Sequence, residues 1–136
     1  MDIQDKKLLV QDLMARIPYG VCVEHIPSGI ILKPTNIAVF PLYKGNEIND
    51  YLCEIDVTGN DNWDKIENFK PYLFDMNSLT KEQYEERSEI LHTICHSGFA
   101  HAFAHKLTDF YNKHHIDYHD LIFLKLANDA SKTKIY

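Results

Sequence analysis

An apolar stripe at helical spacing runs through the C-terminal third of this sequence. Its members recur every three or four residues: Phe99, Phe103, Leu107, Phe110 and His114. This spacing predicts an amphipathic helix over residues 99–113, with Tyr111 on its flank. Upstream, Thr80 followed by Gln83 has the spacing of a capping box, so another helix is expected to begin at Thr80 and to end near Gly98. On the helix that begins at Thr80, one face is expected to be apolar and to contain Tyr84, Leu91 and Cys95.

The N-terminal segment also has the pattern of a helix. Ile3, Leu9 and Leu13 have near-helical spacing, and either Asp2 or Asp5 can cap the first turn. The turn-forming residues that follow residue 17 are expected to end this helix.

Four short runs that follow the first helix are typical of β-strands. They cover residues 21–26, 30–32, 37–40 and 51–57. The first two flank the turn Pro27-Ser28-Gly29 and predict a hairpin, whereas Pro41 is expected to bend or end the third. In the fourth run, polar and apolar residues alternate, which indicates one buried and one solvated face. We therefore expect a small antiparallel sheet of three to four strands.

Two remaining segments have weaker patterns. Residues 63–74 contain Pro71 and are expected to form a loop or a single turn that packs aromatic side chains over the sheet. Asp117 can cap a last helix over residues 118–127. The polar tail beyond is expected to fray, unless the terminal Ile135-Tyr136 folds back.

Together these elements predict one domain of the α+β class that spans residues 1–136. It would contain an N-terminal helix, the antiparallel sheet, and two or three C-terminal helices packed on one face. Hydrophobic residues make up 45% of the chain and charged residues 25%. That composition is typical of globular proteins, and the length suffices to bury a core without metal or disulfide support.

Charge and cysteine content indicate which partners and which cellular compartment to expect. The net charge is −6 with neutral histidines, and no cluster of Lys and Arg appears, which disfavours nucleic-acid binding. Cys22, Cys53 and Cys95 are widely spaced and odd in number, which favours a reducing compartment, and we expect a cytoplasmic protein. Cys22 and Cys53 are expected in the core. No stretch approaches the roughly 18 apolar residues of a membrane span.

Histidine is the compositional oddity, because seven of the eight histidines lie between residues 92 and 119. His92 with His96, and His101 with His105, each place two rings one helical turn apart, a spacing that can grip a metal ion. The candidate ligands in segment 92–105 and beside it are Glu89, His92, Cys95 and His96. We favour the other interpretation, a solvated helix face, because a metal site needs further converging ligands and no HExxH pattern supplies a base.

No coherent catalytic set is visible in the sequence. Cys95 and His96 are neighbours in sequence, but their side chains diverge on a helix. Neither a Gly-x-Ser-x-Gly motif nor a glycine-rich loop occurs, so catalytic residues stay unassigned and no cofactor is expected. Arg16 is expected to anchor the helix-to-strand corner through a carbonyl or a carboxylate, with a binding edge as the alternative. His114 is expected to be a satisfied helix-end residue.

Three stretches of the chain together resemble a known family. They are DLMARIPYGV (12–21), KPYLFDMNSLTKEQYEE (70–86) and YNKHHIDYHDLI (111–122). The resemblance is to a family of small uncharacterised proteins encoded by phages and prophages of gut Bacteroidetes. This chain has Phe74-Asp75 and His119-Asp120 where the family pattern has Arg-Pro and Arg-Gly. The resemblance implies a phage-related origin and supplies no catalytic residues.

The expected function is that of a phage- or prophage-related accessory or protein-binding protein without catalytic activity. Its partner would be a protein, with self-association into a homo-oligomer as a further option. The alternative is a zinc-type metal-binding module, or a metal-dependent enzyme, that uses the histidine-rich segment 92–105.

Overall fold

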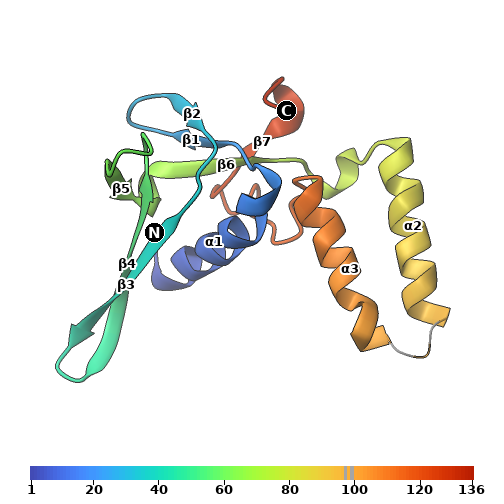
Figure 1. Cartoon of the computed structure of the whole chain (residues 1–136), viewed down its shortest axis with the longest axis horizontal. Helices are drawn as coiled ribbons and strands as arrows, with labels where there is room; N and C mark the ends of the chain where they lie inside the picture. Colours follow the sequence, from blue (N-terminus) through green and yellow to red (C-terminus); the bar gives the residue numbers. More distant parts are fainter. Residues whose placement is uncertain (97, 99) are drawn as a thin grey trace.

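The structure is a computed structural model that describes residues 1–96, 98 and 100–136, and only the backbone of residues 100–103. Its helices are α1 (Ile3–Arg16), α2 (Lys81–His96) and α3 (Ala100–Lys113). In Figure 1, α2 and α3 lie side by side as a hairpin to one side of the strands, whereas α1 lies next to the strands. The mixed helix-and-strand content and the N-terminal helix agree with the sequence prediction.

The strands form two sheets rather than the single antiparallel sheet that the sequence predicts. One sheet has the order β2-β1-β6-β7 and consists of β1 (Val23–His25), β2 (Ile30–Leu32), β6 (Phe69–Leu73) and β7 (Asn128–Asp129). The other has the order β3-β4-β5 and consists of β3 (Ile37–Lys44), β4 (Glu47–Asp56) and β5 (Trp63–Lys65). Pairing is antiparallel except between β6 and β7, which are parallel. Short 3-10 turns follow α1 and separate several of the later elements: η1 (Ile17–Tyr19), η2 (Ile66–Asn68), η3 (Met76–Ser78) and η4 (Ala130–Lys132).

Helix α1 begins and ends as its sequence predicts. The Asp2 carboxylate accepts a hydrogen bond of 2.8 Å from the Asp5 amide, which caps the first turn. Gly20 adopts a left-handed conformation with φ 71° just after η1, a conformation that glycine reaches without a Cβ clash. The buried side of α1 carries Leu9 and Leu13, neither of which is exposed to solvent.

The main core lies between α1 and the two sheets. Its buried members come from α1, residues 21–23, β4, the η2–β6 segment and residues 121–127: Leu9, Val10, Leu13, Val21, Val23, Cys53, Ile55, Ile66, Phe69, Leu73, Leu121, Leu126 and Ala127. Each fully buried aliphatic or aromatic side chain contributes roughly 1.5–3 kcal/mol. Cys22 and Cys53 are both buried, which confirms their predicted core positions.

The prediction of a loop over residues 63–74 was wrong, because this segment supplies β5 and the inner strand β6. Pro71 is tolerated within β6 because it stands at a position where the backbone nitrogen does not bond to β1. The Tyr72 amide donates to the Cys22 carbonyl at 2.9 Å, and Val23 stands opposite Pro71. Since antiparallel ladder bonds alternate along a strand, the Pro71 nitrogen points away from β1 and no bond to that neighbour is lost.

Helix α2 begins with the predicted capping box. The Gln83 amide donates to Thr80 Oγ1 at 3.1 Å, and the Thr80 amide donates to Gln83 Oε1 at 3.0 Å. Its predicted apolar face was wrong, however, because Tyr84 and Cys95 are exposed. Ile90 instead lies in a small cluster with α3, which determines the side that α2 buries.

The C-terminal helices pack in a cluster of their own. Its members come from α2, α3 and the segments next to them: Met76, Leu79, Ile90, Leu107, Phe110, Tyr111, Ile116 and Tyr118. The expectation that these helices cover one face of a sheet is therefore not confirmed. Within the described chain, the helix that contributes to the core between the sheets is α1.

Residues 118–127 form turns rather than the predicted third C-terminal helix. The Asp117 carboxylate does act as a cap, because it accepts hydrogen bonds from the Leu121 amide at 2.9 Å and the Ile122 amide at 2.8 Å. Asp120 and Lys125, with φ 58° and 62°, are left-handed, and such residues interrupt a right-handed helix. The tail is ordered by β7 and η4 instead of fraying.

Candidate binding site between α1 and the β3–β4 ribbon

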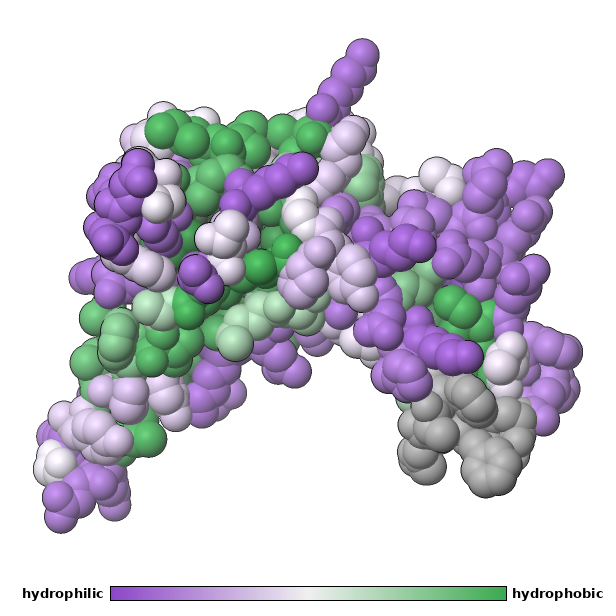
Figure 2. Space-filling view, viewed as in Figure 1, coloured by the Kyte–Doolittle hydropathy of each residue, from purple (hydrophilic) through white to green (hydrophobic). Residues whose placement is uncertain are grey.

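The β3–β4 ribbon, defined here as β3 and β4 together, projects beyond the rest of the molecule (Figure 1). Strand β5 pairs only with Glu54–Asp56, so within the described chain the part of β4 before Glu54 is paired on one side alone. Large apolar side chains are exposed along β3 and near the start of β4: Val39, Phe40, Leu42, Tyr43 and Ile48. Figure 2 shows hydrophobic residues along the ribbon and hydrophilic residues at its tip.

The ribbon carries apolar side chains on both of its faces. Residues that stand opposite one another share a face, and successive residues alternate. Val39 stands opposite Cys53 and faces α1, whereas Phe40 stands opposite Leu52 and faces away from it. Val39 is 42% exposed and Phe40 is 52% exposed, so neither face is fully covered.

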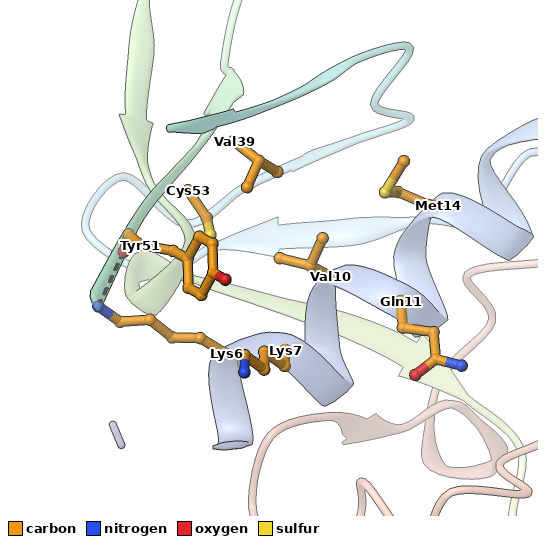
Figure 3. A pocket seen from close by; sticks show the side chains of 8 residues that line it. All are labelled: Lys6, Lys7, Val10, Gln11, Met14, Val39, Tyr51 and Cys53. Atoms are coloured by element: carbon orange, nitrogen blue, oxygen red, sulfur yellow. Dashed lines mark hydrogen bonds between the residues drawn. The ribbon is translucent and has the colours of Figure 1, made fainter. Parts of the chain in front are cut away.

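A pocket of about 400 Å³ opens between α1 and the ribbon. Helix α1 and strands β3 and β4 supply its lining: Lys6, Lys7, Val10, Gln11, Met14, Val39, Tyr51 and Cys53. In Figure 3, Val10 and Met14 extend from α1 toward Val39, which closes the opposite wall. The walls are mainly apolar, and the polar groups belong to Lys6, Lys7 and Gln11 of α1 and to the Tyr51 hydroxyl of β4.

The two lysines at the pocket differ in their electrostatic surroundings. Lys6 Nζ lies 3.2 Å from Asp50 Oδ2 and 3.4 Å from Glu67 Oε1. Burial opposes its charge, but the Asp50 hydrogen bond and the two carboxylates outweigh burial and raise the pKa of Lys6. Lys7 Nζ lies 5.4 Å from the centroid of the Tyr51 ring, a cation–π contact, and no ion pair of Lys7 is found within the described residues.

Two further groups at the pocket are held in defined protonation states. Hydrogen bonds from the Tyr51 amide and from Lys6 lower the pKa of Asp50, which keeps this carboxylate ionised. Burial raises the pKa of the Cys53 thiol. Since the thiolate is the reactive form of cysteine, this shift disfavours reaction at Cys53, whose side chain forms part of the pocket wall.

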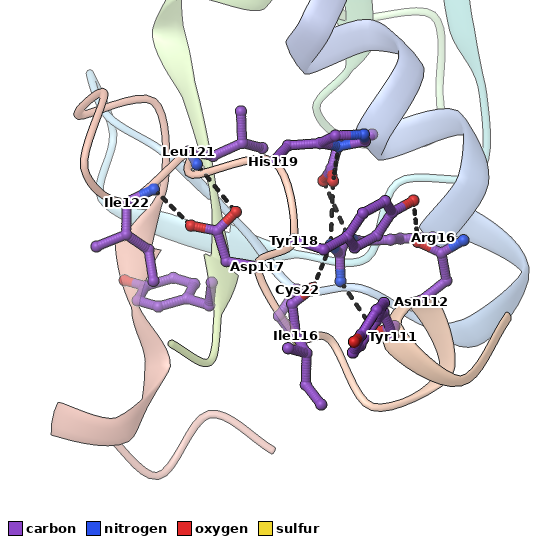
Figure 4. Close-up of polar contacts among 12 residues, drawn as sticks. Arg16, Cys22, Tyr111, Asn112, Ile116, Asp117, Tyr118, His119, Leu121 and Ile122 are labelled. Carbon is purple, nitrogen blue, oxygen red and sulfur yellow. Dashed lines mark hydrogen bonds and ion pairs between the residues drawn. The ribbon is translucent and has the colours of Figure 1, made fainter. Parts of the chain in front are cut away.

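Arg16 lies apart from this pocket, at the centre of a buried polar network (Figure 4). Its guanidinium donates to both Asp12 oxygens and to the carbonyls of Tyr111 and Ile116. His119 Nδ1 lies 3.0 Å from the same Asp12 carboxylate. The prediction that Arg16 anchors the corner after α1 through carbonyls or a carboxylate is confirmed, and the network joins α1 to the end of α3.

A chain of hydrogen bonds links Ser28, His25 and Asp64, which the sequence did not reveal. Ser28 Oγ lies 2.6 Å from His25 Nδ1, and His25 Nε2 lies 2.8 Å from Asp64 Oδ2. The Asn68 side chain donates to the same Asp64 oxygen at 2.9 Å. None of these residues lines the pocket, and Ser28 lies on the exposed hairpin turn. This arrangement ties β1 of one sheet to β5 of the other.

The predicted metal ligands lie on the exposed part of α2. The rings of His92 and His96 are 4.1 Å apart between centroids, as their spacing predicts, and Glu89 and Cys95 are also exposed. Among the described residues, no group of three or more His, Cys, Asp or Glu side chains could hold a metal ion. The side chain of His101 lies outside the described residues, so the metal alternative stays a prediction. His114 pairs with Glu86 at 3.3 Å, as expected for a satisfied helix-end histidine.

Sequence reasoning missed the pocket and the ribbon. The signal was present in Val39-Phe40-Pro41-Leu42-Tyr43, where no charged residue falls on either face of the strand. A half-buried strand shows apolar and polar residues in alternation, so an unbroken apolar run beside a proline indicates a strand with two apolar faces.

No protein-family model matches the sequence, and no curated protein or solved structure is significantly similar to it. Across residues 1–96, 98 and 100–136, no helix is both long and apolar enough to cross a membrane.

Proposed function

We propose that this chain is a non-enzymatic binding protein whose partner is a protein that covers the β3–β4 ribbon and the adjoining pocket. The observation that carries the proposal is the exposure of apolar side chains on both faces of the ribbon, such as Val39 and Phe40. The resemblance of residues 12–21, 70–86 and 111–122 to phage proteins supports an accessory role in a phage or prophage setting. The three free cysteines fit a cytoplasmic location.

Physical chemistry supports a covered ribbon in the functional state. A two-stranded hairpin is at best marginally stable in water and gains stability when an apolar face packs against another element. Apolar side chains that cluster on a surface mark interaction sites. Full burial of an exposed large apolar side chain contributes roughly 1.5–3 kcal/mol, and Phe40, which is 52% exposed, can gain about half of that on binding. A partner that covers Phe40 and Leu42 would therefore gain a substantial part of its binding free energy there.

The site also favours binding over catalysis. Its cysteine is held as a thiol, its walls are apolar, and Lys6 is engaged by Asp50 and Glu67. An anchor pocket beside an exposed apolar surface is the arrangement in which a few side chains supply most of the affinity in protein–protein interfaces.

The experiment compares three tagged proteins in a lysate of the cells that express the chain. They are the wild type, the ribbon variant Phe40→Ser with Leu42→Ser, and a control with Phe123→Ser and Tyr84→Ser. The control removes two other exposed aromatic side chains, since Phe123 is 85% exposed and Tyr84 60%. A protein recovered in stoichiometric amount is then purified, and its affinity for each variant is measured by isothermal titration calorimetry.

We expect the ribbon variant to bind this partner at least tenfold more weakly than the wild type and the control, since tenfold corresponds to 1.4 kcal/mol. A purified partner that binds all three proteins equally would contradict the proposal. So would the failure to recover any stoichiometric partner with the wild type.

A metal-binding role for segment 92–105 is the second candidate, favoured by the 4.1 Å spacing of the His92 and His96 rings. Two histidines one helical turn apart can chelate zinc if Glu89, Cys95 or a residue from elsewhere completes the ligand set. Elemental analysis and zinc titration of the wild type and of His92→Ala with His96→Ala test this role. Stoichiometric zinc that the double variant loses supports it, and a zinc-free wild type that does not take up zinc rules it out.

A further inference from the structure

The groove between α1 and the ribbon constrains the backbone conformation of its occupant. An extended segment usually docks by adding a strand to a sheet edge, and a helix docks through side chains alone. The first mode needs free amide and carbonyl groups along one edge of the ribbon. At the centre of the ribbon, Pro41 of β3 stands opposite Tyr51 of β4, and the backbone groups of these two residues determine whether either edge can accept a strand.

The β4 edge is occupied by the chain's own side chains. The Tyr51 amide donates to Asp50 Oδ1 at 2.7 Å, and the Tyr51 carbonyl accepts from Lys6 Nζ at 3.3 Å. Both backbone groups of Tyr51 therefore point away from β3 and already have partners. An added strand would have to displace a lysine that two carboxylates hold in place.

The β3 edge is closed at the same level. Residues that face each other in an antiparallel pair direct their backbone groups alike, so the Pro41 nitrogen points to the free side of β3, as the Tyr51 amide points to the free side of β4. Proline has no N–H to donate there. An incoming strand would leave an acceptor unpaired at the centre of β3, which is a known way in which proteins protect an edge.

A helix has no such requirement, because its backbone groups bond within the helix itself. The groove offers it two apolar walls, Val10 and Met14 on α1 and Val39 on β3, with the pocket between them (Figure 3). A helix presents apolar side chains at intervals of three and four residues, which suits a groove lined along the length of α1.

Charge specifies one further property of this occupant. Lys6 is neutralised by Asp50 and Glu67, whereas Lys7 has the Tyr51 ring as its neighbour and no ion pair within the described chain. An acidic side chain on the occupant would complete the surroundings of Lys7. We propose that the groove binds an amphipathic α-helix of the partner, and that this helix presents a carboxylate to Lys7. This inference rests on the protein-binding function proposed above.

The test uses two displayed peptide libraries of equal length. One contains amphipathic helical peptides with randomised apolar and flanking positions, and the other has the same composition with two central prolines that block the helix. Both are selected on the wild type, on Lys7→Glu, and on Val39→Asp or Met14→Asp, which place a charge in the groove. Lys65→Glu is the matched control, a charge reversal at an exposed lysine that does not line the pocket.

We expect the helical library alone to be enriched on the wild type, with Asp or Glu at one flanking position. Selected peptides should lose at least tenfold in affinity with Val39→Asp and with Met14→Asp, while circular dichroism confirms that both variants fold. Lys7→Glu should weaken them about threefold to tenfold and shift a new selection toward Lys and Arg, and Lys65→Glu should do neither.

The remaining outcomes separate this inference from the proposed function. Enrichment of the proline library with the same dependence on Val39 would overturn the helical occupant and leave protein binding in place. No enrichment above the Val39→Asp background in either library would overturn the helical occupant, whereas the proposed function is decided by the calorimetry with Phe40→Ser and Leu42→Ser. A wild-type dimer in light scattering that Val39→Asp dissociates would assign the groove to a second copy of the chain and overturn a separate helical partner.

Discussion

Arg16 and Asp12 form a bidentate ion pair in which neither side chain is exposed to solvent. Arg16 Nε lies 2.8 Å from Asp12 Oδ2, and Arg16 Nη2 lies 3.0 Å from Asp12 Oδ1. The same guanidinium donates to the carbonyls of Tyr111 at 3.3 Å and Ile116 at 2.6 Å, where α3 ends. Two of its four hydrogen bonds thus fix α1 against the C-terminal segment, and the other two bind Asp12 within α1.

Replacing Arg16 with Met is expected to destabilise the fold strongly. The change leaves the Asp12 carboxylate buried without its main partner, and losing one member of a buried pair costs about 3–5 kcal/mol. Urea denaturation followed by circular dichroism measures the loss. The double variant Arg16→Met with Asp12→Leu should recover part of it, and Arg87→Met, whose guanidinium bonds the Tyr111 hydroxyl, is the control. A loss below 1 kcal/mol for Arg16→Met would contradict this role.

The anchoring role of Arg16 could be predicted from the sequence, but its partners could not. A lone arginine at the end of an amphipathic helix, before Pro18 and Gly20, indicates a residue that binds carbonyl or carboxylate groups. Asp12 lies one helical turn away and is a local partner. The two carbonyls, however, lie 95 and 100 positions along the chain, and such contacts follow from the tertiary fold, which local periodicity does not contain.

The C-terminal Tyr136 joins two segments by its hydroxyl group. It accepts a hydrogen bond of 2.9 Å from the Cys22 amide and donates one of 2.8 Å to the Tyr72 carbonyl. Burial raises the pKa of Tyr136, which keeps the hydroxyl protonated as this donor role requires. The sequence left open whether the tail frays or folds back, and the structure supports folding back.

The variant Tyr136→Phe should therefore lower the free energy of unfolding by about 1–2 kcal/mol, because the Cys22 amide and the Tyr72 carbonyl lose a partner. Hydrogen exchange measured residue by residue should show faster exchange of the Cys22 amide. Tyr43→Phe, at a tyrosine that is 63% exposed, is the matched control. Unchanged exchange at Cys22 would argue that the hydroxyl contributes nothing to the order of the tail.

His115 gives stability a specific dependence on pH. Its ring is buried, stacks on Tyr136 at 4.1 Å, and its Nδ1 has no partner among the described residues. Burial, with the positive charge of Arg16 second, lowers the pKa of His115 to about 4. Unfolded histidine titrates near 6.5. Above pH 6.5 both states are neutral at this residue, and between 6.5 and 4 only the unfolded state gains the proton.

This difference should remove up to about 3 kcal/mol of stability as pH falls from 6.5 to 4, with no further loss below. Asparagine replaces histidine without titrating and tolerates the left-handed conformation of His115, with φ 56°. Urea unfolding at several pH values should give a shallower slope for His115→Asn than for the wild type. Histidines paired with carboxylates contribute to both proteins, so equal slopes would show that His115 is not the source.

The error over residues 118–127 has a physical cause. Apolar residues fill most of this segment, so periodicity cannot distinguish a buried helix from a compact set of turns. The Asp117 cap was recognised correctly, but its bonds to the Leu121 and Ile122 amides hold a turn. Left-handed residues at Asp120 and Lys125 are not glycines, and nothing in the sequence marks them. The stripe over residues 99–113 has a polar face, and the helix that it predicts is observed as α3 over Ala100–Lys113, while residue 99 and the side chain of Phe103 lie outside the described residues.

Pro41 is expected to prevent the ribbon from pairing with the ribbon of another molecule. Its nitrogen points to the free side of β3, beside the exposed apolar residues Val39 and Leu42. The variant Pro41→Val supplies the missing N–H and a residue with high strand propensity, so it opens the edge to a strand from another molecule. We expect Pro41→Val to self-associate at concentrations where the wild type does not, as measured by light scattering and analytical ultracentrifugation. Pro34→Val, at a proline between β2 and β3, is the control, since it adds an N–H outside the ribbon. If Pro41→Val and the wild type have the same association state at every concentration, Pro41 is not the residue that protects this edge.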